Sequence, residues 1–345
     1  MNEQYQTIEP TIGHRLFYLD ALRVFAVFSM ILLHVAATPL YREPIDGFNW
    51  QVCNVYDSLV RFCVPVFVMI SGSIFLSPQK NITIKLIFTK YIVRICTAFI
   101  FWSLVYASLA GGGLRSFVLN FINGHFHMWF LFIIFGLYVT TPLVRKIMDE
   151  KKLIEYFLIL GFIFALTLPF VDSFLEGNPI KRFFSAKTHI NLVLGFQFYY
   201  VAGYYLGHYD VPKRYRIIIY HVALLSVIFT IVCTSYVSLK ANELVGVFYN
   251  NLYPTTAFVA MALFLAFKNM CWKPSVKTTL FISALAKLSF GIYLVHVLTL
   301  RFIGLSATSF NPVFSVPLIA LLTFTLSALI VHVMSKIPIL NKYII

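Results

Sequence analysis

The chain has 345 residues, of which 60% are hydrophobic and 12% charged, and its formal net charge is +14 at pH 7. Soluble domains carry roughly a quarter of charged residues, so this composition excludes an ordinary soluble protein and indicates an all-α polytopic membrane protein. The positive charge does not indicate a nucleic-acid partner, because the basic residues form short clusters between apolar runs, as the positive-inside rule explains.

Ten apolar runs are predicted to cross a membrane, because each is close to the ~20 residues that span a hydrocarbon core. Their ranges in chain order are 16–37, 57–76, 86–109, 127–144, 153–171, 190–208, 216–238, 249–267, 288–305 and 313–335. An even number of spans places both termini on one side. Eighteen of the 27 Lys and Arg residues lie on that side, against six on the other and three within spans. Both termini are therefore predicted to be cytoplasmic.

The chain is predicted to form one transmembrane domain over residues 16–336. A short cytoplasmic tail, 1–15, precedes it, and a second one, 337–345, follows it. The five cysteines form no Cys-x-x-Cys pair and have no histidine spacing typical of a metal site. They are interpreted as packed thiols, and no metal site is predicted.

The first predicted span is unusual because it contains Asp20, Arg23 and His34. Eleven residues separate Arg23 from His34, which is three helical turns plus about 20°, so both side chains lie on one face. Their separation along the axis is roughly 16 Å. Asp20 is three residues before Arg23 and is predicted to pair with it. Charges within a span are costly, so a shared face indicates that these groups point into the bundle or a wet cavity.

A simpler interpretation of the same residues also remains open. The Arg23 side chain would extend to the cytoplasmic headgroups, and His34 would lie at the outer interface. The shared face and the presence of Asp20 favour the inward-facing interpretation.

Four motifs occur in an order that is similar to that of a known family. The segment 19–34, "LDALRVFAVFSMILLH", resembles the opening signature of the acyltransferase-3 membrane acyltransferases, Leu-Asp-x-Leu-Arg followed by a histidine eleven residues after the arginine. Three later segments, 61–75, 127–144 and 288–296, resemble further motifs of the family. Their matching residues are Arg61, Pro65, Ser71 and Gly72, then His127, Trp129, Tyr138 and Pro142, then Ser289, Gly291, Tyr293 and His296.

The resemblance covers roughly residues 15–345 and is closest in pattern to the enterobacterial-common-antigen O-acetyltransferase branch. One motif departs from the family. Many members carry Arg-x-x-Arg at the cytoplasmic start of the third span, where this chain has Lys90 and Arg94, four residues apart. Both still lie on one helical face and can meet a phosphate.

The resemblance implies transfer of an acyl group, expected to be acetyl, to a hydroxyl of a cell-envelope polysaccharide or of its lipid-linked precursor. Acyl-CoA (acetyl-CoA) is then a co-substrate, and no permanently bound cofactor is expected. The implied location is the bacterial inner membrane, where the glycan, acyl-CoA and membrane lipids are the partners.

The residues of the first span are consistent with this chemistry. A hydroxyl needs a general base that titrates near neutral pH, and His34 is the first candidate. Arg23 or Arg61 is a candidate to stabilise the negative charge that develops on the thioester carbonyl, or to hold the phosphates of CoA at the inner mouth. Asp20 is assigned to the catalytic set with His34 and Arg23, and a second interpretation, in which it only positions Arg23, stays open.

The two substrates are assigned different residues. The acyl-CoA phosphates are expected to meet Arg61, Lys85, Lys90 and Arg94. The acceptor is expected to meet His127, Trp129, His296 and Tyr293, with the sugar stacked on Trp129. A second interpretation stays open for each set, since lysines also set topology and His and Trp also anchor spans at the interface. Ser71 is a candidate acyl-accepting nucleophile, although Ser-Gly in a span is more often a close helix contact.

Two other functions are consistent with ionisable groups in spans. A transporter or flippase for a sugar-lipid or small solute would also need them, but no repeated halves and no matching pair of broken spans occur in the sequence. A sensor or assembly subunit without chemistry is the third possibility, and the shared face of Arg23 and His34 argues against it. Acyl transfer by the purified protein distinguishes the first function from the other two.

Overall fold

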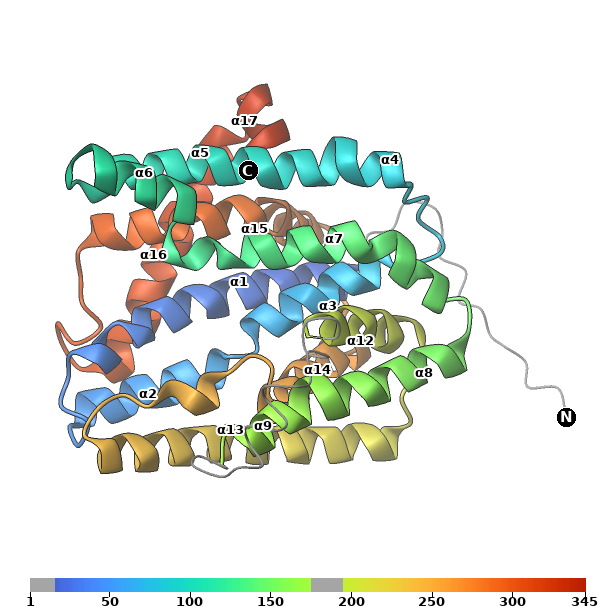
Figure 1. The fold of residues 1–345 in the computed structure, drawn as a ribbon, viewed down its shortest axis with the longest axis horizontal. Coiled ribbons are helices and arrows are strands. Elements are labelled where there is room, and N and C mark those ends of the chain that lie inside the picture. Colours follow the sequence, from blue (N-terminus) through green and yellow to red (C-terminus); the bar gives the residue numbers. More distant parts are fainter. Residues whose placement is uncertain (1–15, 175–194) are drawn as a thin grey trace, which may run out of the picture.

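The computed structural model describes residues 16–174 and 195–345, and within these ranges it contains helices and no strand. Nine stretches of the described chain are helical, long and apolar enough to cross a membrane. They lie roughly parallel and antiparallel to one another in one bundle (Figure 1). The predicted all-α, polytopic membrane architecture is therefore confirmed. The predicted tail 1–15 lies outside the described residues.

The helices keep the order of the predicted apolar runs. They are α1 (Phe17–Ala37), α2 (Phe48–Val60), α3 (Cys63–Phe75), α4 (Ile84–Leu86), α5 (Val93–Ala110), α6 (Gly113–Asn123), α7 (Trp129–Ile147), α8 (Lys151–Leu160), α9 (Leu168–Asp172), α12 (Gln197–His208), α13 (Lys213–Ala241), α14 (Pro254–Asn269), α15 (Val276–Ile303), α16 (Pro312–Met334) and α17 (Pro338–Tyr343). Two π-helical turns, Ile87–Ile92 and Gly161–Thr167, continue α4 into α5 and α8 into α9. The sixth predicted span, 190–208, begins outside the described residues, and α12 is its described part.

The second span differs from its prediction. It extends over Phe48–Phe75 and is broken between α2 and α3. The apolar run began at residue 57 because the residues before it include Asn54, yet Asn54 and Trp50 are both fully buried. Hydropathy underestimates a span whose polar residues contact other helices instead of lipid.

Helix α1 occupies the centre of the bundle. It packs against α2, α3, α14, α15 and α16, and the sequence explains this position. An apolar helix that carries ionisable groups is stable within a bilayer only where other helices surround those groups. We call the side on which α1 begins the inner side, and the side on which it ends the outer side.

Helices α3 and α12 approach each other closely. A Cβ atom on Gly72 would lie 1.8 Å from the carbonyl oxygen of Tyr200, and one on Gly203 would lie 2.0 Å from that of Met69. Both positions therefore require glycine. Small residues allow membrane helices to approach closely, so Gly72 in the Ser-Gly pair marks a helix contact.

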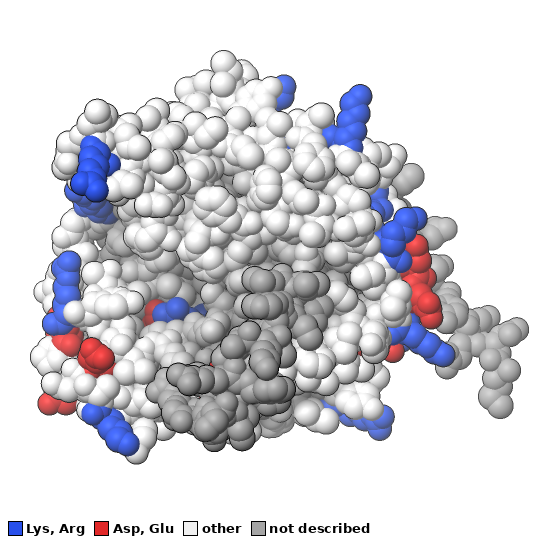
Figure 2. Space-filling model, viewed as in Figure 1, with Lys and Arg blue, Asp and Glu red and all other residues white. Residues whose placement is uncertain are grey.

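The lipid-facing surface is best represented by α13. Its Leu224, Leu225 and Val232 side chains are exposed, while Thr230 and Thr234 are buried against the bundle. Figure 2 shows that most charged side chains of the visible face gather toward the two ends of the helices and that the face between them is largely uncharged. This distribution is typical of a protein that spans a bilayer.

The last residues of the chain form a helix that packs on the bundle. Helix α17 contacts α5, and Thr97 Oγ1 donates a hydrogen bond to the carbonyl oxygen of Tyr343 at 2.6 Å. Ile344 and Ile345 are buried. The predicted tail, 337–345, thus has a defined position beside α5 (Figure 1).

Candidate functional site

Helix α1 carries three of the predicted site residues, and the bundle surrounds all of them. Asp20 is 3% exposed and accepts a hydrogen bond from Ser283 Oγ of α15 at 2.8 Å. Arg23 and His34 are half-buried. The inner end of α1 is thereby joined to α15, and the outer end carries His34 toward the same helix.

His34 belongs to a group of four histidines from three parts of the chain. Besides His34 of α1, they are His125 and His127 from the turn before α7 and His296 from α15; we call them the histidine cluster. The ring centroids of His34 and His296 are 5.1 Å apart, and those of His127 and His296 are 5.2 Å apart. The Nδ1 atoms of His125 and His127 are 2.9 Å apart. The cluster joins residues that lie as far apart in the sequence as 34 and 296.

Tyr293 is hydrogen-bonded to two residues of the cluster. His296 Nδ1 lies 2.6 Å from the carbonyl oxygen of Tyr293. A carbonyl oxygen only accepts, so Nδ1 carries the proton and Nε2 of the neutral ring carries the lone pair. The Tyr293 hydroxyl donates to the carbonyl oxygen of His127 at 2.8 Å. Tyr293 thus holds both His127 and His296 in place.

Two nitrogens of the cluster are buried without a hydrogen bond. His127 and His296 are 2% and 0% exposed, and the Nε2 atom of each has no partner within residues 16–174 and 195–345. An unpaired buried polar atom costs about 1–3 kcal/mol. Native structures keep few such atoms, and a functional site is a common reason for them. Two of them in adjacent rings identify the cluster as the strongest candidate site.

Aromatic rings enclose the cluster. Phe126 lies against His34, with ring centroids 5.5 Å apart, and Tyr106 stacks on His125 at 4.3 Å. The Tyr106 hydroxyl donates to the carbonyl oxygen of Leu294 on α15 at 2.8 Å. These contacts join α5 and α15 to the turn before α7.

A second group of polar residues lies toward the inner side. Tyr138 of α7 is within electrostatic reach of both Arg23 and Arg94. Its ring stacks on Phe75, with centroids 4.4 Å apart. We call Arg23, Arg94 and Tyr138 the inner arginine region. Arg94 also donates to the backbone oxygen of Ile345.

The two predicted lysines flank the inner arginine region. Lys85 and Lys90 are exposed at the start of the third span, and the Lys90 ammonium lies 5.6 Å from the centre of the Tyr91 ring. Lys90 lies within the π-helical turn Ile87–Ile92. Such turns often occur at functional sites, because they shift the register of the side chains that follow.

The structure does not bring all of the predicted residues together. Arg61 lies at the break between α2 and α3 and lines a pocket on the outer side, away from Lys85 and Lys90. Trp129 is 42% exposed and packs against Phe196, with ring centroids 6.2 Å apart. Neither Arg61 nor Trp129 belongs to the histidine cluster or to the inner arginine region.

The cluster itself contains one residue that the sequence analysis had not assigned to the site, His125. Its only signal is the repeated histidine, two residues before His127, and a spacing of two does not specify a contact. In the described chain, no group of three or more His, Cys, Asp and Glu side chains is placed to hold a metal ion.

Comparison with known proteins assigns the chain to a family. The family model Acyl_transf_3, described as an acyltransferase domain, matches residues 16–332. The chain therefore belongs to this family of membrane acyltransferases. Comparisons with curated proteins and with solved structures found no match.

Proposed function

From this family membership and the geometry of the histidine cluster, we propose that the protein transfers an acetyl group from acetyl-CoA to a hydroxyl of an envelope glycan or its lipid-linked precursor. The observation that carries the proposal is the buried cluster around His34, with its two unpaired Nε2 atoms. The proposed location is the bacterial inner membrane, with acetyl-CoA entering from the cytoplasm.

His34 is the proposed general base. His34 is the only residue of the cluster on α1, and it lies on the helix face that also carries Arg23. Its side chain is more exposed than those of His127 and His296. It can therefore meet a substrate while the two buried rings stay in the protein. An imidazole is neutral near pH 7 and accepts a proton readily.

The chemical step is a direct exchange of one bond for another. The sugar hydroxyl attacks the thioester carbonyl, and His34 accepts the hydroxyl proton. The new C–O bond forms, the C–S bond breaks, and the CoA thiolate leaves and takes up the proton. The cluster supplies a site with little water, in which hydrolysis of the thioester is suppressed.

The inner arginine region is the proposed binding site for CoA phosphates. Arg23 and Arg94 offer planar donors that match phosphate oxygens, and exposed Lys85 and Lys90 add positive charge at the entrance. Along α1, Arg23 lies roughly 16 Å from His34. An acyl-CoA that binds with its phosphates near Arg23 extends its acyl arm toward His34.

The test is transfer by the purified protein. We would reconstitute it with radiolabelled acetyl-CoA and an extract of lipid-linked glycan, and compare the wild type with His34→Ala. Loss of a general base lowers the rate by about 100- to 10,000-fold. We therefore expect label in the glycan with the wild type and nearly none with the variant.

The matched control is His221→Ala, since His221 is an exposed histidine on α13. It should transfer at the wild-type rate, and all three proteins should melt at similar temperatures. Wild-type transfer by His34→Ala would remove His34 as the base. Flux of glycan across the vesicle without transfer would favour a transporter instead.

A further inference from the structure

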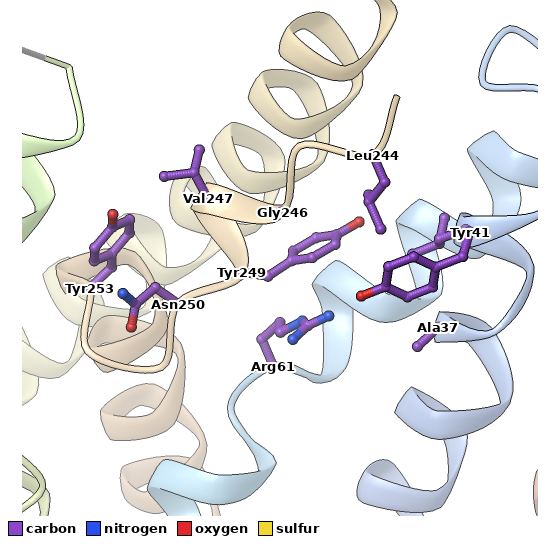
Figure 3. Close-up of a pocket in the computed structure, with 10 residues that line it drawn as sticks. Ala37, Tyr41, Arg61, Leu244, Gly246, Val247, Tyr249, Asn250 and Tyr253 are labelled. Carbon is purple, nitrogen blue, oxygen red and sulfur yellow. The ribbon is translucent and has the colours of Figure 1, made fainter. Parts of the chain in front are cut away.

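A pocket on the outer side of the bundle is lined by no described residue of the histidine cluster or of the inner arginine region. It has a volume of about 440 Å³, which is within the range of small-molecule sites. Its walls come from the end of α1, the break between α2 and α3 and the connection between α13 and α14 (Figure 3). Among the described residues that line it, Arg61 is the only charged one.

Arg61 is held rigidly at the base of this pocket. Its Nε donates to Asp57 Oδ2 at 2.6 Å, and a second guanidinium nitrogen contacts the same carboxylate. The guanidinium carbon lies 4.0 Å from the centre of the Tyr249 ring. Asp57 is fully buried. Because its carboxylate balances the charge of Arg61, the pocket offers hydrogen-bond donors with little net charge.

Tyr249, on which Arg61 stacks, is held in place by hydrogen bonds on the side away from the pocket. The Tyr249 hydroxyl donates to Asn54 Oδ1 at 2.6 Å, and Ser58 Oγ donates to the same oxygen at 3.2 Å. Asn54 Nδ2 in turn donates to the carbonyl oxygen of Ile231 at 3.1 Å. A wall supported in this way is formed before any ligand arrives, which lowers the entropic cost of binding.

The lining has the chemistry of a sugar site. Tyr41 presents an exposed aromatic ring, the Arg61 guanidinium stacked on Tyr249 offers planar donors, and Asn250 adds an amide (Figure 3). The C–H face of a pyranose ring packs on an aromatic ring, while its hydroxyls need planar donors and acceptors of this kind. A phosphate favours a cation whose charge is not already paired. The Arg61 charge is paired with the Asp57 carboxylate, so the pocket suits a neutral ligand better.

The pocket also lies beside the proposed base. Ala37, which lines it, is three residues after His34 on α1, about 4.5 Å further along the axis. Arg61 is within electrostatic reach of His34. We propose that this pocket binds a neutral pyranose ring of the acceptor glycan and so presents a hydroxyl to His34. The inference rests on the proposed transferase function.

The test is Tyr41→Ala, because the Tyr41 side chain is 79% exposed at the mouth of the pocket and its loss leaves the core intact. With acetyl-CoA saturating, we expect the glycan KM to rise by roughly 5- to 10-fold, as for the loss of one aromatic contact. The KM for acetyl-CoA should not change. The control is Tyr156→Ala, an exposed tyrosine of α8. An unchanged glycan KM in Tyr41→Ala would overturn the proposal.

A binding measurement separates this proposal from the transferase function. The probe is radiolabelled oligosaccharide released from the lipid-linked extract, half of it treated with phosphatase, without acetyl-CoA. We expect Tyr41→Ala to bind both halves several-fold more weakly than the wild type does, whether or not transfer occurs. Equal binding by variant and wild type would overturn the subsite. If the wild type bound only the untreated half, the ligand would be recognised by its phosphate, and the claim that the pocket binds a neutral ring would be wrong.

Discussion

The histidine cluster and the inner arginine region share helix α1 but hold their polar groups in different ways. His127 and His296 are buried almost completely. The Tyr293 hydroxyl donates to the His127 carbonyl, and His296 Nδ1 donates to the Tyr293 carbonyl. Around the inner arginine region, by contrast, Lys85 and Lys90 are exposed. Proton transfer depends on a fixed nitrogen with little water nearby, whereas capture of an anion depends on charge that reaches the solvent.

Under the proposed function, this difference suits two parts of one substrate, the charged phosphates of CoA and the uncharged acyl arm. A charged phosphate group need not enter the bilayer, because the cations lie toward the inner side. Only an uncharged acyl arm has to approach His34. The histidine rings around His34 and the cations near Arg23 are therefore suited to different parts of the proposed reaction.

After His34→Ala, the largest effect is expected at the buried end of the comparison, from His296→Asn. The asparagine amide keeps a donor near the position of Nδ1, so the bond to the Tyr293 carbonyl can persist, but the Nε2 lone pair is lost. The His296 ring lies 5.1 Å from that of His34, so its unpaired Nε2 is placed to assist the proposed proton transfer. We expect its loss to lower kcat by about 100-fold, with the acetyl-CoA KM and the melting temperature unchanged. Initial rates and thermal melting in detergent measure these quantities.

His296→Ala is the matched comparison for that variant. It removes both the Nε2 lone pair and the hydrogen bond to the Tyr293 carbonyl. It also leaves a cavity in the protein interior, because the His296 side chain is 0% exposed. Its melting temperature should fall as well as its kcat. If His296→Asn kept wild-type turnover, His296 would have only a structural role.

The sequence predicted the spans well because each one must present about 20 apolar residues to lipid. It failed at the start of the second span, where Asn54 is polar but fully buried and donates a hydrogen bond to the carbonyl oxygen of Ile231 on α13. Hydropathy describes the composition of a segment and contains no information about its neighbours. The same limit hides polar residues in any span that is largely buried.

From helix geometry alone, the site was predictable only where one helix carried it, and the grouping of His127 with His296 came from the family resemblance. The period of the α-helix placed Arg23 and His34 on one face, which needs no knowledge of the rest of the chain. The contacts of His34 with His296 depend on how α1 and α15 pack, and no spacing in the sequence specifies that. Likewise, the break after α2 gives Arg61 its outer position, and the apolar run 57–76 showed no break.

At the inner end, the variant Arg23→Lys distinguishes specific phosphate recognition from simple positioning at the membrane surface. Lysine keeps the charge but replaces a planar fork of donors by a point charge. We expect kcat/KM for acetyl-CoA to fall by about 10-fold, with the glycan KM unchanged. Titration of the initial rate with each substrate provides both values. Normal kinetics would favour the interpretation in which Arg23 only extends to the headgroups.

The smallest effect is expected from the exposed cations, in the double variant Lys85→Gln/Lys90→Gln. Exposed charges attract an anionic substrate over about 8 Å at physiological salt, and this attraction decreases as salt rises. We expect the acetyl-CoA KM to rise by roughly two- to fivefold at low salt and to match the wild type at 1 M. Lys240→Gln, at the outer end of α13, is the control and should change nothing. A defect that persisted at 1 M salt would mean that these lysines contact CoA directly, as the arginines are proposed to do, and the contrast between a charged entrance and a specific arginine site would then be wrong.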